Sequence, residues 1–518
     1  MFLVCCLIVA YMAVPRPVDG AHVFGVPNMN FHSHSQVLLR LGAELVKRGH
    51  VYTHVVADLA KNKTYPENIN ILTYKTSFSS QEVTALMQEM ATAADTGLVA
   101  IFQNLVNARD VIFTAAEDIM NSKQLLDTMN DTASLLLCDM SAFVCPLLAD
   151  VLDKDHVVVV PVMAIEPYGY FTFGQPQALV VTPPFPSLTY LDTSFAARLH
   201  NVLTVPMWYI VFVKYYSLEH VWRRFASRRS PDYRTAALQS ASMVLLSNDF
   251  AVEFPRSLPA HVKMIGPILP KPAGPLPAEY QALLSGPTMI ASFGTVLSGF
   301  GNNLAQVLAD GFAQLPLKVI WKHTEKIPQR LGNNTQLVSF FPQNDLLGDD
   351  RVKLFFTHGG GNSFFESVYH GVPMVCIPLF GDHYRSATLV LEKKIGIVLR
   401  KEELVRPEQI TRAVKEILEN PIYLKNVQKI SAILKDRKNT PAEEGADWIE
   451  YVLRHDGAKH LRNPLIDLPF YQEYMLDVFI FLGVLLFLVV YLIYVCTRFV
   501  CRKCSSGGSA SEDKQKTA

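Results

Sequence analysis

The sequence predicts an α/β protein with two domains and one C-terminal transmembrane helix, and three observations support this prediction. Strand-like and helix-like segments alternate along most of the chain, which is the pattern of parallel sheets joined by crossover helices. Residues 266–277 (GPILPKPAGPLP) contain five prolines. Proline blocks both helices and sheet ladders, so this segment predicts an extended linker between two domains. Residues 478–497 contain no charged side chain, and about 20 apolar residues suffice for a helix to cross a bilayer.

The composition indicates a folded protein that does not bind nucleic acid through bulk positive charge. Half of the 518 residues are hydrophobic, which is enough to fill sizeable cores and excludes intrinsic disorder for most of the chain. The 47 Lys and Arg residues are balanced by 47 Asp and Glu residues, so a nucleic-acid partner is not expected. The excess hydrophobicity lies mainly at the two ends, which argues against a multi-pass membrane protein.

Residues 1–20 predict a secretory signal peptide. The apolar run from Phe2 to Val14 is too short to span a bilayer. Pro15, Pro17 and small residues near Gly20 follow it, as is typical around a cleavage point. The basic region that usually begins such peptides is missing, and a buried first strand is the alternative.

The C-terminal end predicts a membrane anchor with a defined orientation. Arg498, Arg502 and Lys503 follow the apolar segment, whereas acidic residues precede it in the juxtamembrane segment 455–477. By the positive-inside rule, the tail 498–518 is cytoplasmic and the bulk of the chain is lumenal. A buried core helix is the alternative to a membrane span.

The tail also contains a candidate address. Lys514 and Lys516 are the fifth and third residues from the end, and they resemble the dilysine retrieval signal of endoplasmic-reticulum membrane proteins. A merely solvated basic tail is the alternative. We therefore expect a single-pass type I protein of the endoplasmic-reticulum membrane.

Glycosylation and cysteine patterns fit a lumenal location without defining a disulfide framework. Asn-x-Ser/Thr sequons begin at Asn62, Asn130 and Asn333. Among the eight cysteines, only Cys138, Cys145 and Cys376 lie between the signal and the membrane segment. At most Cys138 and Cys145 pair, and the sequence leaves open whether they do.

The linker divides the predicted lumenal part into domains at 21–265 and 278–454. In the first domain, a long segment at 157–188 is apolar but broken by prolines and glycines. It could form a pocket wall, lie on the membrane surface or be an irregular core loop. The clearest expected elements are strands at 22–26, 52–57, 289–293, 318–322, 336–341, 354–358 and 374–378, and helices at 36–49, 303–315, from about Asn362, and at about 407–419.

A glycine-rich turn is the most informative short motif. The strand that ends at His358 is followed by three glycines and then by a predicted helix. Glycines let a ligand approach the backbone closely, and the N–H groups at a helix start form an anion site, usually for phosphate. The alternative is purely structural, because Ser363 and Glu366 match the capping-box pattern.

Beyond this turn, three longer segments resemble one family. They are FPQNDLLG (341–348), FFTHGGGNSFFESVYHGVPMVCIPLFGD (355–382) and WIEYVLRHDGAKHLR (448–462). They resemble the UDP-glycosyltransferases, in particular the membrane-bound UDP-glucuronosyltransferases of animals, and the resemblance covers nearly the whole chain.

The resemblance implies two facing Rossmann-like domains, the GT-B fold, with the donor in the C-terminal domain and the acceptor mainly in the N-terminal one. It implies transfer of a hexosyl group, glucuronosyl by family default, from a UDP-sugar to a hydroxyl of a small lipophilic or lipid acceptor. The UDP-sugar is the co-substrate, and no cofactor or metal is expected. The resemblance leaves both a homo-oligomer and a hetero-oligomer open.

The resemblance also implies a set of donor-binding residues. An aromatic ring stacks on uracil, a glutamine meets the nucleoside, and a carboxylate binds the ribose hydroxyls. The helix start and its neighbours bind the diphosphate, and two residues face the sugar. The ring is Phe340, the glutamine is Gln343 and the ribose-binding carboxylate is Glu366. The residues at the diphosphate are Ser292, Thr295, His358, Gly360, Asn362 and Ser363, and those that face the sugar are Asp382 and His383.

The same resemblance implies that His34 is the catalytic base. The family base precedes the His of an RGH element by sixteen residues, and counting back from His50 gives His34 rather than His32. Both histidines precede the predicted helix and are expected on a loop. A solvated loop histidine is the ordinary alternative, and it holds for His32. Asp139, at the end of a predicted strand, matches the family Asp that orients the base, although Met140 departs from the usual Pro or Ala.

These roles define a mechanism. Imidazole takes the proton of the acceptor hydroxyl during attack, and a buried carboxylate fixes its tautomer. The helix N-terminus and His358 stabilise the departing UDP without a metal, and the α-linked donor is inverted to a β-glycoside. The alternative is a catalytically silent protein that binds sugar nucleotides, and the presence of both His34 and Asp139 favours the enzyme.

Two departures from the family pattern concern the sugar. Glucuronate users usually have Gln where this chain has His383, and they often carry Arg where it has Ser247. An arginine fork is the natural partner of a sugar carboxylate. The run GDHY (381–384) instead resembles the branch of the family that transfers galactose to ceramide. The alternative to glucuronosyl transfer is therefore galactosyl or glucosyl transfer on the same fold.

Overall fold

The computed structural model describes residues 20–27, 32–61, 63–79, 81–83, 85, 98–161, 194–209, 218–226, 240–294, 301–324, 327–379, 381–401, 404–462, 468–473 and 475–507. Several predictions fall outside these residues: most of the signal segment, Asn62, Thr295, most of the apolar stretch 157–188, and the lysines at 514 and 516. The chain divides into two units, Met1–Arg462 and Asn463–Ala518, and each is described by itself.

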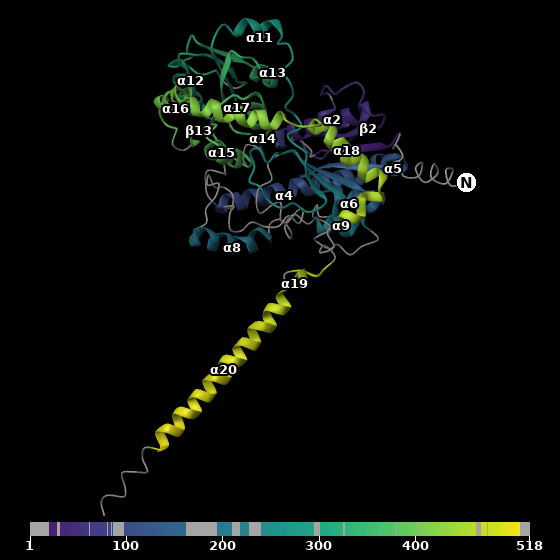
Figure 1. Cartoon of the computed structure of the whole chain (residues 1–518). Helices are drawn as coiled ribbons and strands as arrows, with labels where there is room; N and C mark the ends of the chain where they lie inside the picture. The colour runs from purple at the N-terminus through teal and green to yellow at the C-terminus, as the bar shows by residue number, and fades with distance from the viewer. Residues whose placement is uncertain are drawn as a thin grey trace, which may run out of the picture. The chain divides into compact units, whose positions relative to one another are not determined.

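The first part of the larger unit is built on a fully parallel seven-stranded sheet (Figure 1). Its strand order is β3-β2-β1-β4-β5-β6-β7. The strands β4 and β5 are buried along their whole length, because helices cover both faces of a parallel sheet, and this explains their continuous apolar sequences. The strands are β1 (His22–Val26), β2 (Val51–Ala57), β3 (Asn70–Tyr74), β4 (Leu135–Asp139), β5 (His156–Val160), β6 (Met243–Leu246) and β7 (Val262–Met264).

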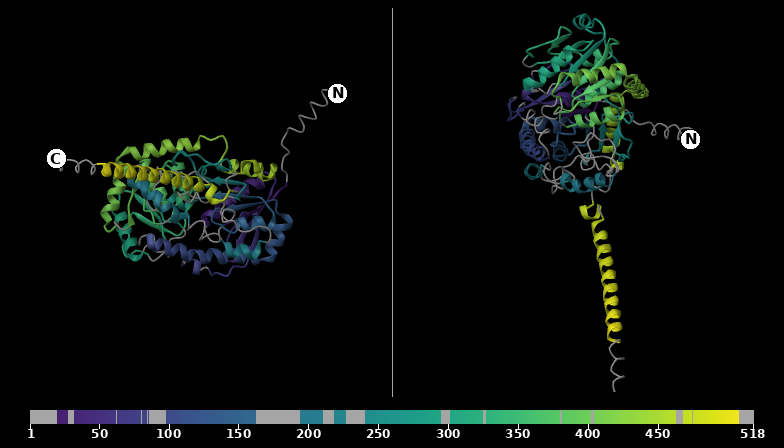
Figure 2. Two further views of the ribbon diagram at one scale, coloured as in Figure 1. Left: turned by 90° about the horizontal axis from the view of Figure 1, so that it is seen from below. Right: turned by 90° about the vertical axis from the view of Figure 1, so that its left-hand side faces the viewer.

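The second part is built on a parallel six-stranded sheet with the order β10-β9-β8-β11-β12-β13. In both sheets the strand order reverses beside the first strand, as in Rossmann-like folds. Figure 2 shows the purple-to-blue strands and the green strands in separate halves of the unit. The strands are β8 (Thr288–Ser292), β9 (Lys318–Lys322), β10 (Thr335–Val338), β11 (Val352–Thr357), β12 (Met374–Cys376) and β13 (Gly396–Val398).

Helices connect the strands and cover both sheets. Around the first sheet they are α2 (His32–Lys47), α4 (Leu98–Asn121), α5 (Lys123–Thr132), α6 (Cys145–Leu152), α8 (Phe195–Tyr209) and α9 (Glu219–Phe225), with the 3-10 turn η1 (Asp58–Ala60). After the linker they are α11 (Ala278–Leu283), α12 (Gly301–Ala313), α13 (Gln343–Leu347), α14 (Gly361–His370), α15 (His383–Glu392), α16 (Pro407–Glu419), α17 (Pro421–Lys435) and α18 (Pro441–Arg454), with the 3-10 turn η5 (Asp456–Leu461).

The predicted alternation of strands and helices is confirmed, and several boundaries agree, including β1, β9 and α16. One boundary was wrong. The first helix, α2, begins at His32 rather than near Gln36, so the segment that holds His32 and His34 is helical and not a loop. The residues from 32 to 35 (HSHS) include no proline or glycine that would stop the helix, which therefore extends by one turn.

Helix α18 follows the second sheet in the chain but packs against α2 and β6 of the first (Figure 1). Its apolar side chains Ala446, Ile449 and Val452 are buried in the core of the first sheet. We call residues 20–265 together with 441–462 the first lobe, and residues 278–435 the second lobe. The predicted bounds of the second domain, 278–454, include α18, because local periodicity does not indicate which sheet a helix covers.

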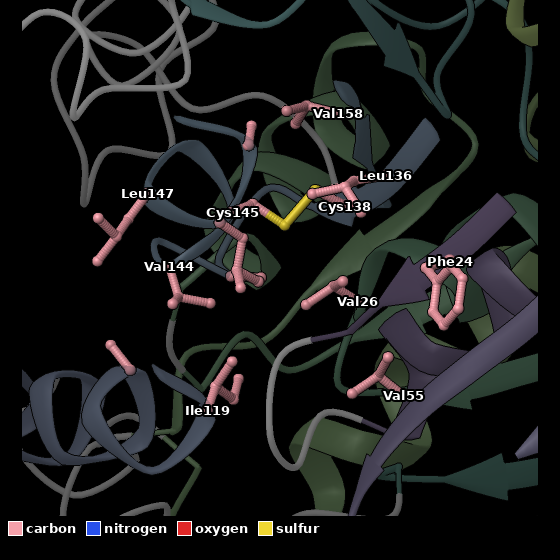
Figure 3. Close-up of a cluster of buried hydrophobic side chains, with 14 of the residues drawn as sticks. Phe24, Val26, Val55, Ile119, Leu136, Cys138, Val144, Cys145, Leu147 and Val158 are labelled. Carbon is pink, nitrogen blue, oxygen red and sulfur yellow. A yellow bond between two sulfur atoms is a disulfide. The ribbon is translucent and has the colours of Figure 1, made fainter. Parts of the chain in front are cut away.

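A disulfide joins Cys138 of β4 to Cys145, the first residue of α6. The two sulfurs lie in the apolar core of the first sheet, among side chains that include Val26, Leu136 and Val158 (Figure 3). This pairing, which the sequence left open, fixes the end of β4 against α6. Asp139 is the next residue of the strand, and its backbone is therefore held in place.

The smaller unit contains α19 (Phe470–Glu473) and α20 (Leu476–Gly507). Residues Leu476–Lys503 form a helix that is long and apolar enough to cross a membrane, with a mean hydropathy of 3.0. The predicted span at 478–497 lies inside this helix. The candidate membrane helix is thus confirmed by length and composition.

Candidate active site

The strand order of each sheet places its functional residues. In open α/β sheets, ligands bind outside the carboxyl ends of the strands, at the point where the strand order reverses. In the first lobe this point lies between β1 and β4, and α2 with His34 follows β1 while Asp139 ends β4. In the second lobe it lies between β8, which ends at Ser292, and β11, which His358 follows.

Both points face one cavity of about 570 Å³. Ten of the predicted donor-binding residues line it together with the predicted base. Asp139 contacts the predicted base but is not among the residues that line the cavity, and Thr295 lies outside the described residues. The lining residues are Ser33, His34 and Gln36 of the first lobe, Lys271 of the linker, and Ser292, Phe293, Gly294, Lys322, Phe340, Phe341, Pro342, Gln343, Asn344, Asp345, His358, Gly360, Gly361, Asn362, Ser363, Glu366, Asp382 and His383 of the second lobe.

The predicted base and its predicted partner are in direct contact. The Nδ1 atom of His34 lies 2.9 Å from Oδ2 of Asp139, and both side chains are buried. The other carboxylate oxygen of Asp139 accepts hydrogen bonds from the backbone N–H and the hydroxyl of Ser141. An ionised carboxylate only accepts hydrogen bonds, so Nδ1 of His34 must donate, and Nε2 keeps a lone pair that can take a proton.

The surroundings of His34 make its imidazole more basic. Burial alone lowers the pKa, but the charge of Asp139 and its hydrogen bond, with a smaller contribution from Asp382, outweigh burial and raise the pKa of His34 above its ordinary value. Asp382 belongs to the second lobe and His34 to the first, so their charges interact across the cavity. Burial is also the main reason that the pKa of Asp382 is raised.

The glycine-rich turn approaches the cavity with its backbone. Gly359 has a φ of +81°, a conformation that favours glycine. At Gly360 a Cβ would lie 2.6 Å from Nε2 of His358, so a side chain there would displace the imidazole. Helix α14 begins directly afterwards, and the N–H of Gly361 donates to a carboxylate oxygen of Asp382 at 3.1 Å. The turn thus presents a helix N-terminus to the cavity, as expected for an anion site.

The capping-box alternative for Ser363 and Glu366 is wrong. The residue that caps α14 is Gly360, and no side chain caps the helix. Instead, the amide nitrogen of Gln343 donates to the hydroxyl of Ser363 at 3.0 Å and to the carboxylate of Glu366 at 2.5 Å. These three polar side chains line the cavity, and burial raises the pKa of Glu366 to about 7.

Two histidines of the second lobe form a neutral pair. The rings of His358 and His383 are 4.6 Å apart and nearly perpendicular. Burial lowers the pKa of His358 to about 4 and that of His383 well below its ordinary value. At neutral pH these side chains can donate one hydrogen bond and accept another but contribute no positive charge.

The sequence missed several lining residues, notably Lys271 and Lys322. The Phe340 side chain is 65% exposed, and Nζ of Lys322 lies 6.0 Å from the centre of its ring. Lys322 is the last residue of β9, and the same strand-end rule that indicated Asp139 could have identified it. Lys271 lies in the proline-rich linker, where no sequence pattern marks a functional residue.

Ser247, which the resemblance aligns with an Arg of glucuronate users, is not among the residues that line the cavity. Its side chain is buried and accepts a hydrogen bond from the N–H of Ile268 at 3.1 Å. The absence of Arg at this position therefore bears on the sugar less directly than the sequence suggested. His383 does line the cavity and remains the departure that matters.

Comparison with known proteins indicates a glycosyltransferase. The family model described as UDP-glucoronosyl and UDP-glucosyl transferase matches residues 24–510. The chain is 32% identical over 505 residues to a mouse (Mus musculus) protein named 2-hydroxyacylsphingosine 1-beta-galactosyltransferase, covering 95% of this chain and 91% of that one. It is 30% identical over 495 residues to UDP-glucuronosyltransferase 2B30 of Macaca fascicularis, covering 91% and 92% of the two chains.

The fold has solved counterparts. The crystal structure of Os79 from O. sativa in complex with U2F and trichothecene matches with a TM-score of 0.59 and 16% identity, covering 83% of this chain and all of that one. At this level of identity the match shows a shared GT-B fold and no more. The predicted arrangement of two Rossmann-like domains is thereby confirmed.

Asp139→Asn is expected to slow glycosyl transfer and to move the acidic limb of its pH–rate profile to lower pH. In the wild type, kcat/KM should rise with pH as His34 loses its proton, and the charge of Asp139 raises the pKa of His34.

His34→Ala should slow transfer by about 10²–10⁴-fold and leave UDP inhibition intact. Initial rates across the neutral pH range measure both effects. His32→Ala is the control, and a loss confined to that variant would assign the base to His32.

If Glu366 binds the ribose hydroxyls, as the resemblance implies, binding of a UDP-hexose should weaken as the pH falls through about 7, because the carboxylate is then protonated. Glu366→Gln should bind more weakly above this pH and lose the dependence. A UDP-hexose is a better probe than UDP, because UDP has a terminal phosphate that itself titrates near about 6. Calorimetric titration at several pH values measures the affinity. The same pH dependence in Glu366→Gln as in the wild type would mean that another group titrates.

Proposed function

Since the chain belongs to the UDP-glucoronosyl and UDP-glucosyl transferase family, we propose that it transfers a hexosyl group from a UDP-sugar to a hydroxyl of a lipophilic acceptor, with inversion. That the chain is a UDP-glycosyltransferase follows from its membership of this family. The sugar, the acceptor and the roles of individual residues are the proposal. One observation supports it most strongly: the buried contact between His34 and Asp139, which faces the cavity opposite Asp382 and His383.

In the proposed reaction, Nε2 of His34 takes the acceptor proton as the oxygen attacks the anomeric carbon. The raised pKa of His34 favours this transfer, because the driving force for taking up a proton is larger for a stronger base. Asp139 stabilises the imidazolium that forms and prevents the ring from turning. Asp382 holds sugar hydroxyls by accepting hydrogen bonds from them, and its negative charge also stabilises the imidazolium nearby.

The second lobe would stabilise the departing UDP. The N-terminus of α14 and the hydroxyl groups of Ser292 and Ser363 lie at the cavity wall, where N–H and O–H donors can meet a diphosphate. His358 acts as a neutral hydrogen-bond donor, because burial lowers its pKa to about 4. Phe340 presents its exposed ring for stacking on uracil, and Lys322 lies near enough to contribute positive charge.

For the sugar, we propose a neutral hexose that is used at least as well as glucuronate. His383 is neutral and buried beside Asp382, where it can distinguish hydroxyl positions but cannot neutralise a carboxylate. Among the described residues that line the cavity, the side chains with a basic amino group are Lys271 and Lys322. The similarity to galactosyltransferases that act on 2-hydroxyacylsphingosine supports a neutral sugar, whereas the similarity to glucuronosyltransferases keeps glucuronate as the competing donor.

A small apolar hollow at the carboxyl edge of the first sheet supports a lipophilic acceptor. It has a volume of about 30 Å³ and lies where β1 and β4 end, close to Asp139. Its lining is largely apolar: Pro27, Tyr74, Ile112, Ala115, Ala116, Ile119, Ser141, Ala142, Phe143 and Val144. Its volume admits only a small group, so the hollow would supply part of an apolar wall for the acceptor and not the whole acceptor pocket.

We also propose that the large unit is lumenal in the endoplasmic reticulum. The disulfide between Cys138 and Cys145 is typical of proteins that fold in oxidising compartments. The sequon residues Asn130 and Asn333 are both exposed, so glycans could be attached there. The membrane helix at Leu476–Lys503 with a basic tail would make the chain a type I membrane protein.

The donor proposal is tested with UDP-galactose, UDP-glucose, UDP-N-acetylglucosamine and UDP-glucuronate in microsomes that contain the full chain and mixed lipophilic acceptors. The wild type should use a neutral hexose at least as fast as glucuronate. His383→Gln should change the ratio among donors and leave UDP inhibition nearly unchanged, because imidazole and amide place their donors and acceptors differently. Exclusive use of UDP-glucuronate by the wild type would refute the proposal, as would an equal loss with every donor in His383→Gln.

The location is tested by replacing Lys514 and Lys516 with serine. If these lysines are read by the retrieval receptor, the variant should leave the endoplasmic reticulum, and glycans at Asn130 or Asn333 should become resistant to endoglycosidase H. Asn130→Gln and Asn333→Gln show which sequon is occupied. Glycans that stay sensitive in the lysine variant would mean that another part of the chain retains the protein.

A further inference from the structure

A short segment of the first lobe is built into the second. Residues 248–256, which we call the strap, leave the carboxyl end of β6 and return toward β7. Val252 of the strap is fully buried in the core of the second lobe, together with residues of α11, β8 and α15. The first lobe is therefore anchored in the second at a place far from the linker in sequence.

The next residue of the strap, Glu253, is a fully buried carboxylate. Its oxygens lie 2.5 Å from a guanidinium nitrogen of Arg385 and 3.0 Å from one of Arg256, and they accept a hydrogen bond from Asn248 at 3.2 Å. Burial raises the pKa of Glu253, but the two arginines outweigh burial and lower it. A buried charge that is paired in this way is stable, whereas removal of one partner leaves an uncompensated charge.

Arg385 connects this carboxylate to the candidate active site. It lies in the first turn of α15, two residues after His383 and three after Asp382, and only 12% of its side chain is exposed. The rest of α15 is fixed in the second lobe, because Ala387, Leu389 and Val390 are buried in its core. The contact between Arg385 and Glu253 thus joins the first lobe to the helix turn that carries the sugar-facing residues.

A second arginine holds the other end of the strap. Arg437, which follows α17, contacts Asp249 at 2.6 Å and donates to the carbonyl oxygen of Ile265 at 2.8 Å. It lies beside the start of the linker, where a Cβ at Gly266 would be 2.9 Å from its guanidinium group. The two contacts are chemically alike, but only that of Arg385 adjoins the cavity.

We propose that the ion pair of Glu253 and Arg385 is a positioning contact that sets the separation of His34 from Asp382 and His383. The base and the sugar-facing residues belong to different lobes, and Arg385 lies within three residues of the latter in the chain. Glu253 and Arg385 act through His34 and Asp382, and they do not touch the substrate. The inference rests on the proposed function, because it assigns the pair a role in that reaction.

The test compares Arg385→Gln with Arg437→Gln as a matched control. Each variant replaces one arginine that contacts a carboxylate of the strap, and Arg437 also contacts Glu444 of α18, so both should lower the melting temperature. Arg385→Gln should reduce kcat, by up to about 10²-fold if the base is displaced by about 1 Å, and leave UDP inhibition unchanged. Arg437→Gln should retain a larger share of kcat. Arg385→Lys, which keeps the charge, should recover part of the lost rate.

A double variant separates the pair from general destabilisation. Glu253→Gln and Arg385→Gln should together cost less in kcat than the product of the two single losses, because each single change already breaks the pair. Additive losses would overturn the inference. So would a wild-type kcat in Arg385→Gln, or equal losses of kcat in Arg385→Gln and Arg437→Gln.

A distance measurement makes the test independent of turnover. Spin labels at Asp127→Cys in α5 and Lys415→Cys in α16, both exposed positions in different lobes, report the distance between lobes. The exposed cysteines at 496 and 501 and the cysteine at 504 are replaced by serine. Arg385→Gln should shift or broaden the distance distribution, and an unchanged distribution would overturn the inference. If the wild type transfers no sugar but Arg385→Gln still changes the distribution and weakens binding of a UDP-hexose relative to UDP, the proposed function fails and the positioning contact stands.

Discussion

The candidate site depends on one buried charge. Asp139 is fully buried at the end of β4, and a carboxylate in such a place is stable only when its oxygens accept hydrogen bonds. His34 supplies one of these bonds and Ser141 supplies two. Because the disulfide at Cys138 fixes the strand end against α6, the carboxylate cannot move toward another partner. The orientation of the imidazole follows from this constraint, and in the proposed reaction it determines where the acceptor hydroxyl would lie.

The two lobes create opposite electrostatic conditions for their histidines. In the first lobe the charge of Asp139 raises the pKa of His34, so the ring gains a proton readily. In the second lobe burial without a carboxylate partner lowers the pKa of His358 to about 4, so the ring stays neutral and serves as a fixed hydrogen-bond partner. The proposed transfer needs both, because a proton must be taken from the acceptor while negative charge is stabilised on the leaving group.

Local sequence patterns were sufficient for the elements and for most of the site, because buried parallel strands are apolar runs and ligands gather at their carboxyl ends. They were not sufficient where tertiary contacts decide. The capping-box pattern at Ser363 and Glu366 was misleading, since Gln343 binds both side chains. Periodicity did not indicate that α18 packs on the first lobe, nor that Lys271 of the linker lines the cavity. The roles of the site residues could be predicted only from the family resemblance, because periodicity indicates secondary structure and not chemical roles.

The way the chain crosses between lobes explains why these tertiary contacts matter. A base on one lobe can act on a sugar bound to the other only if the lobes keep a separation that hydrogen-bonded atoms can span. A single linker such as residues 266–277 would leave that separation free. In this chain the strap 248–256 is buried in the second lobe, and α18 at 441–454 returns to the first. Relative movement of the lobes must therefore disturb the buried contacts of the strap in the second lobe, and the second chain crossing before α18 restricts the movement further.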